Sequence, residues 1–342
     1  MEYLPDYFQG ILSENLKDGD LAKLPSESVY YDNIKFSDSK LNEMKDLLNS
    51  KIIYNVEIYN EIVKLSDTIT IKQLYLLYNQ ITSLELFSEK IIPSLERLIL
   101  ENNQIKSFKG LSGKTFPNLK ELGLTYNKIT SFQELSGEIF LKLETLYLYG
   151  NQITSLKGLS GETFPKLEIL NLHNNQISSF EGLSEKIFPK LIRLYLSINQ
   201  IFSFEGLSGE IFPILEYLDL RDNQISSFKE LSGKIFPKLE KLVLTYNQIT
   251  SFEGLSGKTF PKLKELYLHN NQISSFKGLS GKIFPNLEEL DLISNQISSF
   301  EGLSEKIFPN LEILWLRGNQ ISSFEGLSEE IFPNFQKIIH IQ

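Results

Sequence analysis

The segment LEELDLISNQISSFEGLSEKIFPN, residues 287–310, decides the fold of this chain, because a near copy of it stands 24 residues away in either direction. A fixed period of this length indicates a repeat architecture and takes precedence over local secondary-structure patterns. The repeat runs unbroken from Ile71 to Asn334 as eleven units, and a twelfth begins at Phe335. Its central asparagine recurs with no slip in spacing, at Asn79, Asn103, Asn127, Asn151, Asn175, Asn199, Asn223, Asn247, Asn271, Asn295 and Asn319.

The composition limits the class of protein. The 342 residues are 41% hydrophobic and 23% charged, as in globular proteins, and a repeat array extends a single domain without limit. The net charge of −9 argues against a nucleic-acid partner, because phosphate contacts need clustered lysine and arginine. The chain has no cysteine, so the sequence predicts neither a disulfide framework nor a thiolate metal site.

The sequence also carries signals about the compartment. The N-terminus, Met1-Glu-Tyr-Leu-Pro-Asp6, lacks the basic and apolar regions of a signal peptide, and no run approaches membrane-spanning length. No asparagine lies in a glycosylation sequon. Together with the absence of cysteine, these features predict a cytoplasmic protein without membrane contact. The abundance of Ile, Lys, Asn, Tyr and Phe is typical of an AT-rich genome.

Residues 1–70 lie outside the clean repeat and are predicted to form a helical cap over the open end of the array. Pro5 suits the first turn of a short helix. Ser37 suits the N-cap of a helix over residues 38–48, where apolar residues follow a helical spacing. Two domains therefore follow from the sequence, a cap at 1–70 and a repeat array at 71–342.

A second interpretation applies to residues 4–45. The segment Leu4-Pro5-Asp6, with Ile11 and Leu16 after it, loosely resembles an F-box, a module that docks on ubiquitin-ligase scaffolds. Pro25 interrupts the segment where the next helix of that module should continue, and the later tryptophan of the module is missing. This resemblance implies a substrate adaptor of a ubiquitin ligase as an alternative function.

Each unit reads Leu-x-x-Leu-x-Leu-x-x-Asn-x-Ile, as at Leu95, Leu98, Leu100, Asn103 and Ile105. On these residues, roughly four-fifths of the chain resembles the leucine-rich-repeat family. The second half of the unit is similar to the short subclass of phosphatase-1 regulatory subunits and internalins, with two extra residues before Phe-Pro. The resemblance implies an α/β solenoid with a concave parallel sheet, and with the base composition it implies a giant virus, an AT-rich protist or an intracellular bacterium as the source. A viral or bacterial effector would work in the host cytoplasm.

The physical reasons for this fold are local. We number positions from the first leucine of each unit, so that Leu95 is at position one. The alternation at Leu98-Ile99-Leu100 predicts a short strand with its leucines inward, and identical units place the strands in parallel about 4.8 Å apart. The asparagine at position nine is expected to satisfy backbone groups of the turn and to form an internal ladder. Glycine at position sixteen and proline at position twenty-three predict short 3-10 turns on the convex side, and the phenylalanines are expected to stack in columns.

Positions five and seven differ freely between units, whereas the core positions hardly change. We expect both positions to face solvent on the concave face, where tyrosine, tryptophan and arginine often anchor interfaces. Drift without function is the alternative, but it should favour small or charged residues over aromatic ones. The candidate partner-binding residues are Tyr147, Tyr149, His173, Tyr195, Asp219, Arg221, Tyr267, His269, Asp291, Trp315 and Arg317.

The sequence offers no catalytic residue, cofactor site or metal site. His173 and His269 lie four units apart, or about 19 Å, which is too far to share a metal. The serines belong to the repeat and suggest no Ser–His–acid arrangement. We therefore predict a non-enzymatic scaffold that binds a protein or peptide, with a structural or decoy array as a further alternative.

Two further expectations concern partners. The five strand positions that we expect to be exposed are two, three, five, seven and eight of each unit. Together they carry 14 acidic and 8 basic side chains, a mixture that suits a protein better than nucleic acid or membrane. At the other end of the array, residues 335–342 start a strand without a polar cap. An open apolar edge predicts self-association through this segment.

Overall fold

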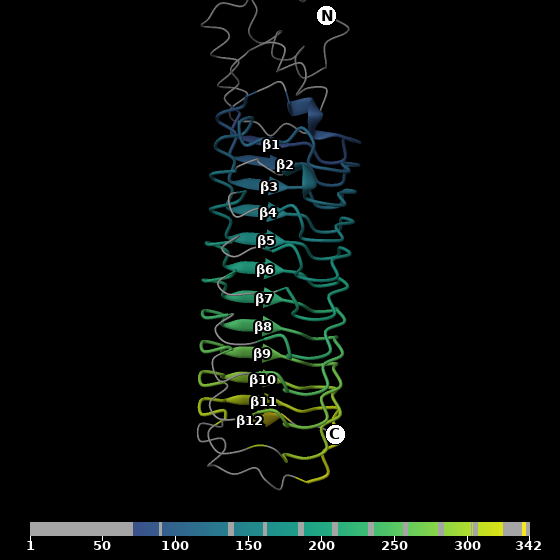
Figure 1. Ribbon diagram of the computed structural model, residues 1–342, viewed down its shortest axis with the longest axis vertical. Helices are drawn as coiled ribbons and strands as arrows, with labels where there is room; N and C mark the ends of the chain where they lie inside the picture. Colours follow the sequence, from purple (N-terminus) through teal and green to yellow (C-terminus); the bar gives the residue numbers. More distant parts are fainter. Residues whose placement is uncertain are drawn as a thin grey trace, which may run out of the picture.

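The computed structural model describes the repeat array, with short gaps. The described residues are 71–88, 91–135, 140–159, 163–183, 188–206, 211–231, 236–255, 259–279, 284–301, 303, 307–323 and 337–339. The expected helical cap at 1–70 and the F-box-like segment at 4–45 lie outside them. Within the described part, each 24-residue unit forms one coil, and the coils stack in a single column (Figure 1).

Each coil contributes one three-residue strand at positions three to five. The strands are β1 (Gln73–Tyr75), β2 (Arg97–Ile99), β3 (Glu121–Gly123), β4 (Thr145–Tyr147), β5 (Ile169–Asn171), β6 (Arg193–Tyr195), β7 (Tyr217–Asp219), β8 (Lys241–Val243), β9 (Glu265–Tyr267), β10 (Glu289–Asp291), β11 (Ile313–Trp315) and β12 (Lys337–Ile339). They pair in chain order as one parallel sheet, each strand shifted by one repeat, so that Leu98 pairs with Leu122. The predicted parallel solenoid is confirmed, and so is a twelfth strand; self-association through that strand stays a prediction.

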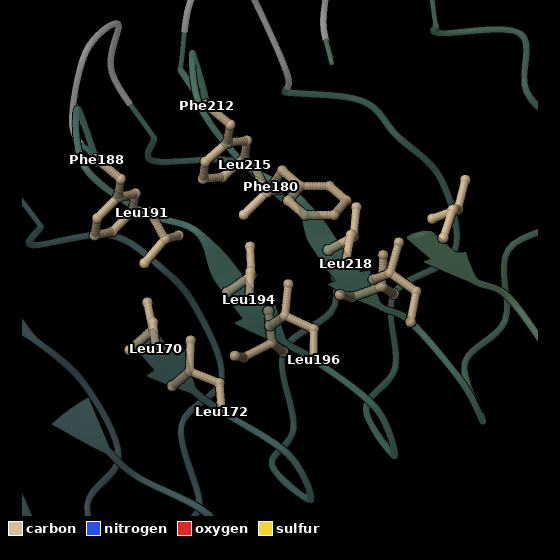
Figure 2. Packing of buried hydrophobic residues seen from close by; sticks show 14 of the residues in the cluster. Leu170, Leu172, Phe180, Phe188, Leu191, Leu194, Leu196, Phe212, Leu215 and Leu218 are labelled. Atoms are coloured by element: carbon tan, nitrogen blue, oxygen red, sulfur yellow. The ribbon is translucent and has the colours of Figure 1, made fainter. Parts of the chain in front are cut away.

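The core lies between the sheet and the return half of each coil. Leucines at positions four and six, such as Leu194 and Leu196, point inward and are almost fully buried (Figure 2). Phenylalanines at positions fourteen and twenty-two form the two predicted columns: the rings of Phe180 and Phe204 are 6.4 Å apart and nearly parallel, and those of Phe188 and Phe212 are 6.0 Å apart. Burial of each such side chain stabilises the fold by about 1.5–3 kcal/mol.

The asparagines at position nine join neighbouring coils, as predicted. The Oδ1 atom of Asn223 accepts the backbone N–H of Ile201 in the preceding coil at 2.9 Å. Its Nδ2 atom donates to the carbonyl of Leu196 in that coil at 3.0 Å and to the carbonyl of Leu220 in its own coil at 3.1 Å. A short amide therefore satisfies backbone groups that the turn leaves without strand partners.

The turn of the return half depends on the residue at position sixteen. Gly158 has a φ of +100°, and a Cβ atom there would lie 2.7 Å from the carbonyl carbon of Phe132 in the preceding coil. In two coils with another residue at this position a 3-10 helix forms instead, η2 (Leu84–Phe87) and η3 (Gln133–Leu135), whereas Glu230 of coil seven lies in a turn. The expected short turns are thus of two kinds. Neither helix in the described part of the chain has the length or hydropathy to span a membrane.

Candidate partner-binding face

We call the outward residues at positions three, five and seven of each coil the strand face. Positions five and seven were expected to face solvent, and in the described coils this is wrong for five residues at position five and three at position seven. Asp219 and Asp291 are only 1% and 6% exposed. The other buried residues are Ile99, Gly123 and Val243 at position five, and Thr125, Ser197 and Thr245 at position seven. Strands about 4.8 Å apart bring outward side chains into contact, so a small side chain is covered by its larger neighbours. The strand face is therefore a layer of interacting side chains.

Two of the candidate side chains, together with Tyr126, begin a line of contacts across coils three to seven. The ring of Tyr149 lies 4.7 Å from the ring of Tyr126 in the preceding coil and 4.7 Å from the ring of His173 in the next. The hydroxyl of Tyr126 donates to the hydroxyl of Tyr149 at 2.6 Å, and this bond raises the pKa of Tyr126. Burial lowers the pKa of His173, so its imidazole is neutral at pH 7.

The line continues through polar contacts to an ion pair. His173 Nδ1 lies 2.6 Å from Ser197 Oγ, and this hydroxyl lies 3.3 Å from Asp219 Oδ2. Arg221 holds the same carboxylate through its Nε and Nη2 atoms at 3.0 and 2.7 Å. Asp219 is buried, and the guanidinium compensates its charge. We call the connected residues Tyr126, Tyr149, His173, Ser197, Asp219 and Arg221 the His173 line.

The contacts that join His173, Ser197 and Asp219 were not predicted from the sequence. Their order differs from that of a hydrolytic triad, in which the acid orients the histidine and the serine is open to substrate. Here Asp219 contacts the hydroxyl of Ser197, and Ser197 is only 2% exposed. The contacts stabilise the face but do not present a nucleophile.

His269 and Asp291 form a second pair, four coils from His173. His269 Nδ1 lies 2.7 Å from Asp291 Oδ2, and the other oxygen of Asp291 accepts the backbone N–H of Ile293 at 2.9 Å. The ring of Tyr246 packs edge-on against His269 at 5.6 Å. Among the described residues, no three His, Cys, Asp or Glu side chains gather as a metal ion would need.

Tyr267 and Trp315 meet through a carboxylate. Trp315 Nε1 donates to Glu289 Oε1 at 2.8 Å, and the hydroxyl of Tyr267 lies 3.1 Å from Glu289 Oε2 and 2.9 Å from Glu265 Oε2. Lys241 pairs with Glu265 at 2.6 Å, and its Nζ atom lies 4.6 Å from the centroid of the Tyr267 ring. Burial and the two carboxylates raise the pKa of Tyr267, so its hydroxyl stays protonated at neutral pH. We call Lys241, Glu265, Tyr267, Glu289 and Trp315 the Glu289 cluster.

The remaining candidates are distributed over the face. Tyr147 is half-buried, and burial raises the pKa of its hydroxyl. The ring of Tyr195 lies 5.2 Å from that of Tyr217, whose pKa burial raises to about 12. Arg317 is exposed, two residues beyond Trp315. The candidates named from the sequence therefore contact one another through residues that were not among them. Ser197 links His173 to Asp219, and Glu265 and Glu289 join Tyr267 and Trp315.

No residue at position eight was among the candidates named from the sequence. In all eleven coils its φ lies between about +50° and +72°, the left-handed region that favours glycine and asparagine. Four coils nevertheless carry a large apolar or aromatic residue there, and each is exposed: Tyr78 at 73%, Tyr126 at 46%, Ile198 at 44% and Tyr246 at 52%. The signal was available in the sequence, since the other seven units have Asn, Gly, Asp or Ser at this position. We call these four residues the rim residues, because they end the strand face.

The comparison with protein families agrees with this geometry. A family model described as Leucine Rich repeats (2 copies) matches residues 93–137, 141–185, 213–257, 237–281, 261–305 and 285–329, together more than half of the chain. The chain belongs to the leucine-rich-repeat family. Membership accounts for the inward leucines and the asparagine ladder, which all coils share, but not for the strand face, which differs from coil to coil. No curated protein sequence matches the chain.

Solved leucine-rich-repeat structures resemble the chain at low sequence identity. An internalin (inlF) from Listeria monocytogenes is 25% identical with a TM-score of 0.59, over 76% of this chain and 70% of that one. A chain of the LRIM1/APL1C complex is 25% identical with a TM-score of 0.59, over 79% and 47%. A chain of the TLR13–ssRNA13 complex is 22% identical with a TM-score of 0.51, over 84% and 48%. This chain therefore spans about half the length of the latter two. In all, 388 chains match, so the fold alone selects no activity.

Proposed function

We propose that this leucine-rich-repeat protein is a non-enzymatic binding protein that recognises another protein through its strand face and rim residues. The observation that carries the proposal is the distribution of sequence change. Residues that build the coil repeat almost unaltered, whereas the outward positions hold tyrosine, tryptophan, histidine and arginine in a different combination in each coil. Tyrosine, tryptophan and arginine dominate the binding energy of protein interfaces.

The rim residues support a binding role because each is unfavourable in the free protein. A residue other than glycine in the left-handed conformation costs roughly 1–2 kcal/mol, and an exposed apolar side chain favours unwanted association. Ile198 and Tyr246 combine both costs, although asparagine serves the same turn in neighbouring coils at Asn174 and Asn270. Such residues are expected where selection acts on a contact and not on stability.

Charge and the solved relatives favour a protein as the partner. The LRIM1/APL1C structure is a complex of two proteins. The TLR13–ssRNA13 complex contains RNA instead, but the likeness to that chain concerns the fold alone. The net charge of −9 and the excess of acidic side chains over positions two, three, five, seven and eight of the units disfavour phosphate binding here. A cytoplasmic location and a viral or microbial source would agree with this proposal, and they stay predictions.

The proposal is tested by affinity capture with two matched variants. The first replaces Tyr147, Tyr195, Tyr267 and Trp315 by alanine, which removes four aromatic side chains from the strand face. The second replaces Gln152, Gln200, Gln272 and Gln320 by alanine; these exposed residues lie in the same four coils but at position ten, beyond the strand face. Proteins that the native chain captures reproducibly should be lost with the first variant and kept with the second.

A circular-dichroism spectrum and a thermal unfolding curve of each variant show that the solenoid is intact. Capture of the same proteins by both variants would overturn the proposal. Loss with both variants would also overturn it, because the contact would then not be specific to the strand face.

A further inference from the structure

The Glu289 cluster holds a carboxylate between two aromatic side chains from different strands. Glu289 is at position three of β10, and Tyr267 and Trp315 are at position five of β9 and β11. Both oxygens of Glu289 are engaged, one by the indole N–H and the other by the phenol hydroxyl, whose single proton is shared with Glu265. These two bonds fix the aromatic side chains beside the carboxylate before any partner arrives, which reduces the entropy lost on binding.

We call the interval between the side chains of Tyr267 and Trp315, which come from the strands on either side of β10, the slot. Strands β9 and β11 are separated by β10, so their position-five residues project from backbones about 9.6 Å apart. Between them at position five is Asp291, which is buried and turned to His269. A cation is attracted to an aromatic ring within about 6 Å of its centroid, so one cation between the two backbones is within reach of both rings.

The charges around this slot favour a cation. Within the described part of the chain, Glu289 accepts hydrogen bonds only from neutral donors and has no ion pair, so its negative charge is uncompensated. Glu288 and Glu312 are exposed immediately before β10 and β11. Lys241 and Lys264 are already paired with Glu265 and Glu240. Arg317 is the nearby cation that remains among the described residues, and it stands at position seven, beyond Trp315.

The chain itself provides a cation for a similar arrangement one strand away. The Nζ atom of Lys241 lies 4.6 Å from the ring centroid of Tyr267 and 2.6 Å from a carboxylate oxygen of Glu265. A lysine from β8 thus already occupies a site made of a tyrosine ring and a glutamate. The slot on the other side of β9 has the corresponding groups, Tyr267 and Trp315 with Glu289, and no lysine among the described residues is paired with Glu289.

We propose that the slot between Tyr267 and Trp315 binds a lysine or arginine side chain from a basic segment of the protein partner. The inference rests on the proposed function and specifies its chemistry. The cation lies between the two rings and forms a charge-assisted contact with Glu289, and the remaining segment follows the acidic side chains of the neighbouring coils. Glu289 is the specificity-determining residue, because a neutral or acidic side chain would leave its charge unpaired.

The only tryptophan of the chain is Trp315, so intrinsic fluorescence reports directly on this slot. The purified full chain is titrated with a synthetic peptide of lysine, arginine, glycine and serine, and with a matched peptide in which glutamine replaces each basic residue. The basic peptide should cause a saturable change in Trp315 emission that weakens as ionic strength rises. The glutamine peptide should leave the emission unchanged.

Two variants keep the fluorophore and test the mechanism. Glu289→Gln should weaken binding of the basic peptide about tenfold or more, which corresponds to roughly 1.4 kcal/mol, and Tyr267→Leu should weaken it through loss of one ring. Glu168→Gln removes the same charge from an exposed position-two site in coil five and should leave the affinity within about twofold. Equal binding of the two peptides, or native affinity in both slot variants, would overturn the proposal.

The experiment separates this inference from the proposed function. If the four-alanine variant loses its captured proteins while the basic peptide never changes Trp315 emission, the strand face binds a partner but the slot does not bind a cation. If the peptide titrates the slot while the four-alanine variant keeps its captured proteins, the cation site exists but the proposed function fails.

Discussion

The imidazole of His173 and the hydroxyl of Ser197 are 2.6 Å apart, although the two residues belong to successive coils. Burial lowers the pKa of His173; Asp219 and Asp222 oppose this effect, and Arg221 adds to it. Because the folded-state pKa lies below the ordinary value of 6.5, the unfolded chain takes up the proton first as the pH falls. The contribution of His173 to the free energy of unfolding is therefore present above pH 6.5 and declines on acidification below it.

Proton NMR can follow this titration, since the chain has only three histidines. The Cε1 proton of His173, assigned by its loss in His173→Gln, should titrate with a midpoint below 6.5. The same variant should show a smaller fall in thermal stability than the native chain between pH 6.5 and 5. A midpoint at or above 6.5 would contradict the assigned role of burial.

The His173–Ser197 contact also shows where prediction from the sequence ended. Strict repetition predicted the asparagine ladder and the phenylalanine columns, because a period of 24 residues fixes which equivalent atoms meet. The contacts of the strand face are made by residues that do not repeat. Alternation indicates that Asp219 points outward, but only the side chains in the adjacent coils, such as Arg221 and Ser197, decide that it is covered.

Backbone conformation was a second limit. Position eight carries no hydrophobic pattern, so the sequence pattern did not predict its left-handed φ, which the structure shows. Comparison of the units at this position alone would have indicated the turn, since Asn102, Gly150, Asn174 and Gly318 are typical of it. The exposed rim residues then stand out as exceptions.

Replacement of a rim residue is expected to stabilise the protein. Ile198 has a φ of +50° and is 44% exposed, whereas the equivalent Asn174 adopts a φ of +53° at lower cost. We expect Ile198→Asn to raise the free energy of unfolding by about 1 kcal/mol, through relief of backbone strain. Phe202→Ser is the control, because Phe202 is also an exposed apolar residue of this coil but does not have a positive φ. Chemical denaturation should find the control within about 0.5 kcal/mol of the native chain.

The asparagine ladder predicts a large effect from the replacement of one nitrogen atom by oxygen. In the native chain, Nδ2 of Asn223 donates hydrogen bonds to the carbonyls of Leu196 and Leu220. In Asn223→Asp an oxygen takes its place and faces the same two carbonyls without a hydrogen to donate. A buried charge without a partner costs about 3–5 kcal/mol, and urea unfolding at pH 7 should detect that loss. The deficit should shrink at acidic pH, since a protonated carboxyl can donate one of the two bonds. Gln224→Glu changes an exposed neighbour and should be nearly neutral; an equal loss there would indicate a general charge effect.

The last prediction concerns the close approach of coils at position sixteen. Gly158→Ala must place a Cβ atom 2.7 Å from the carbonyl carbon of Phe132 while the backbone keeps a φ of +100°. We expect the free energy of unfolding to fall by at least about 1–3 kcal/mol, because neither the strain nor the clash can be relieved without separating the coils. Glu134→Ala also places alanine at position sixteen, but in the preceding coil, where η3 replaces the glycine turn. Denaturation midpoints of the two variants should therefore differ clearly, and similar midpoints would show that the coils yield at this contact.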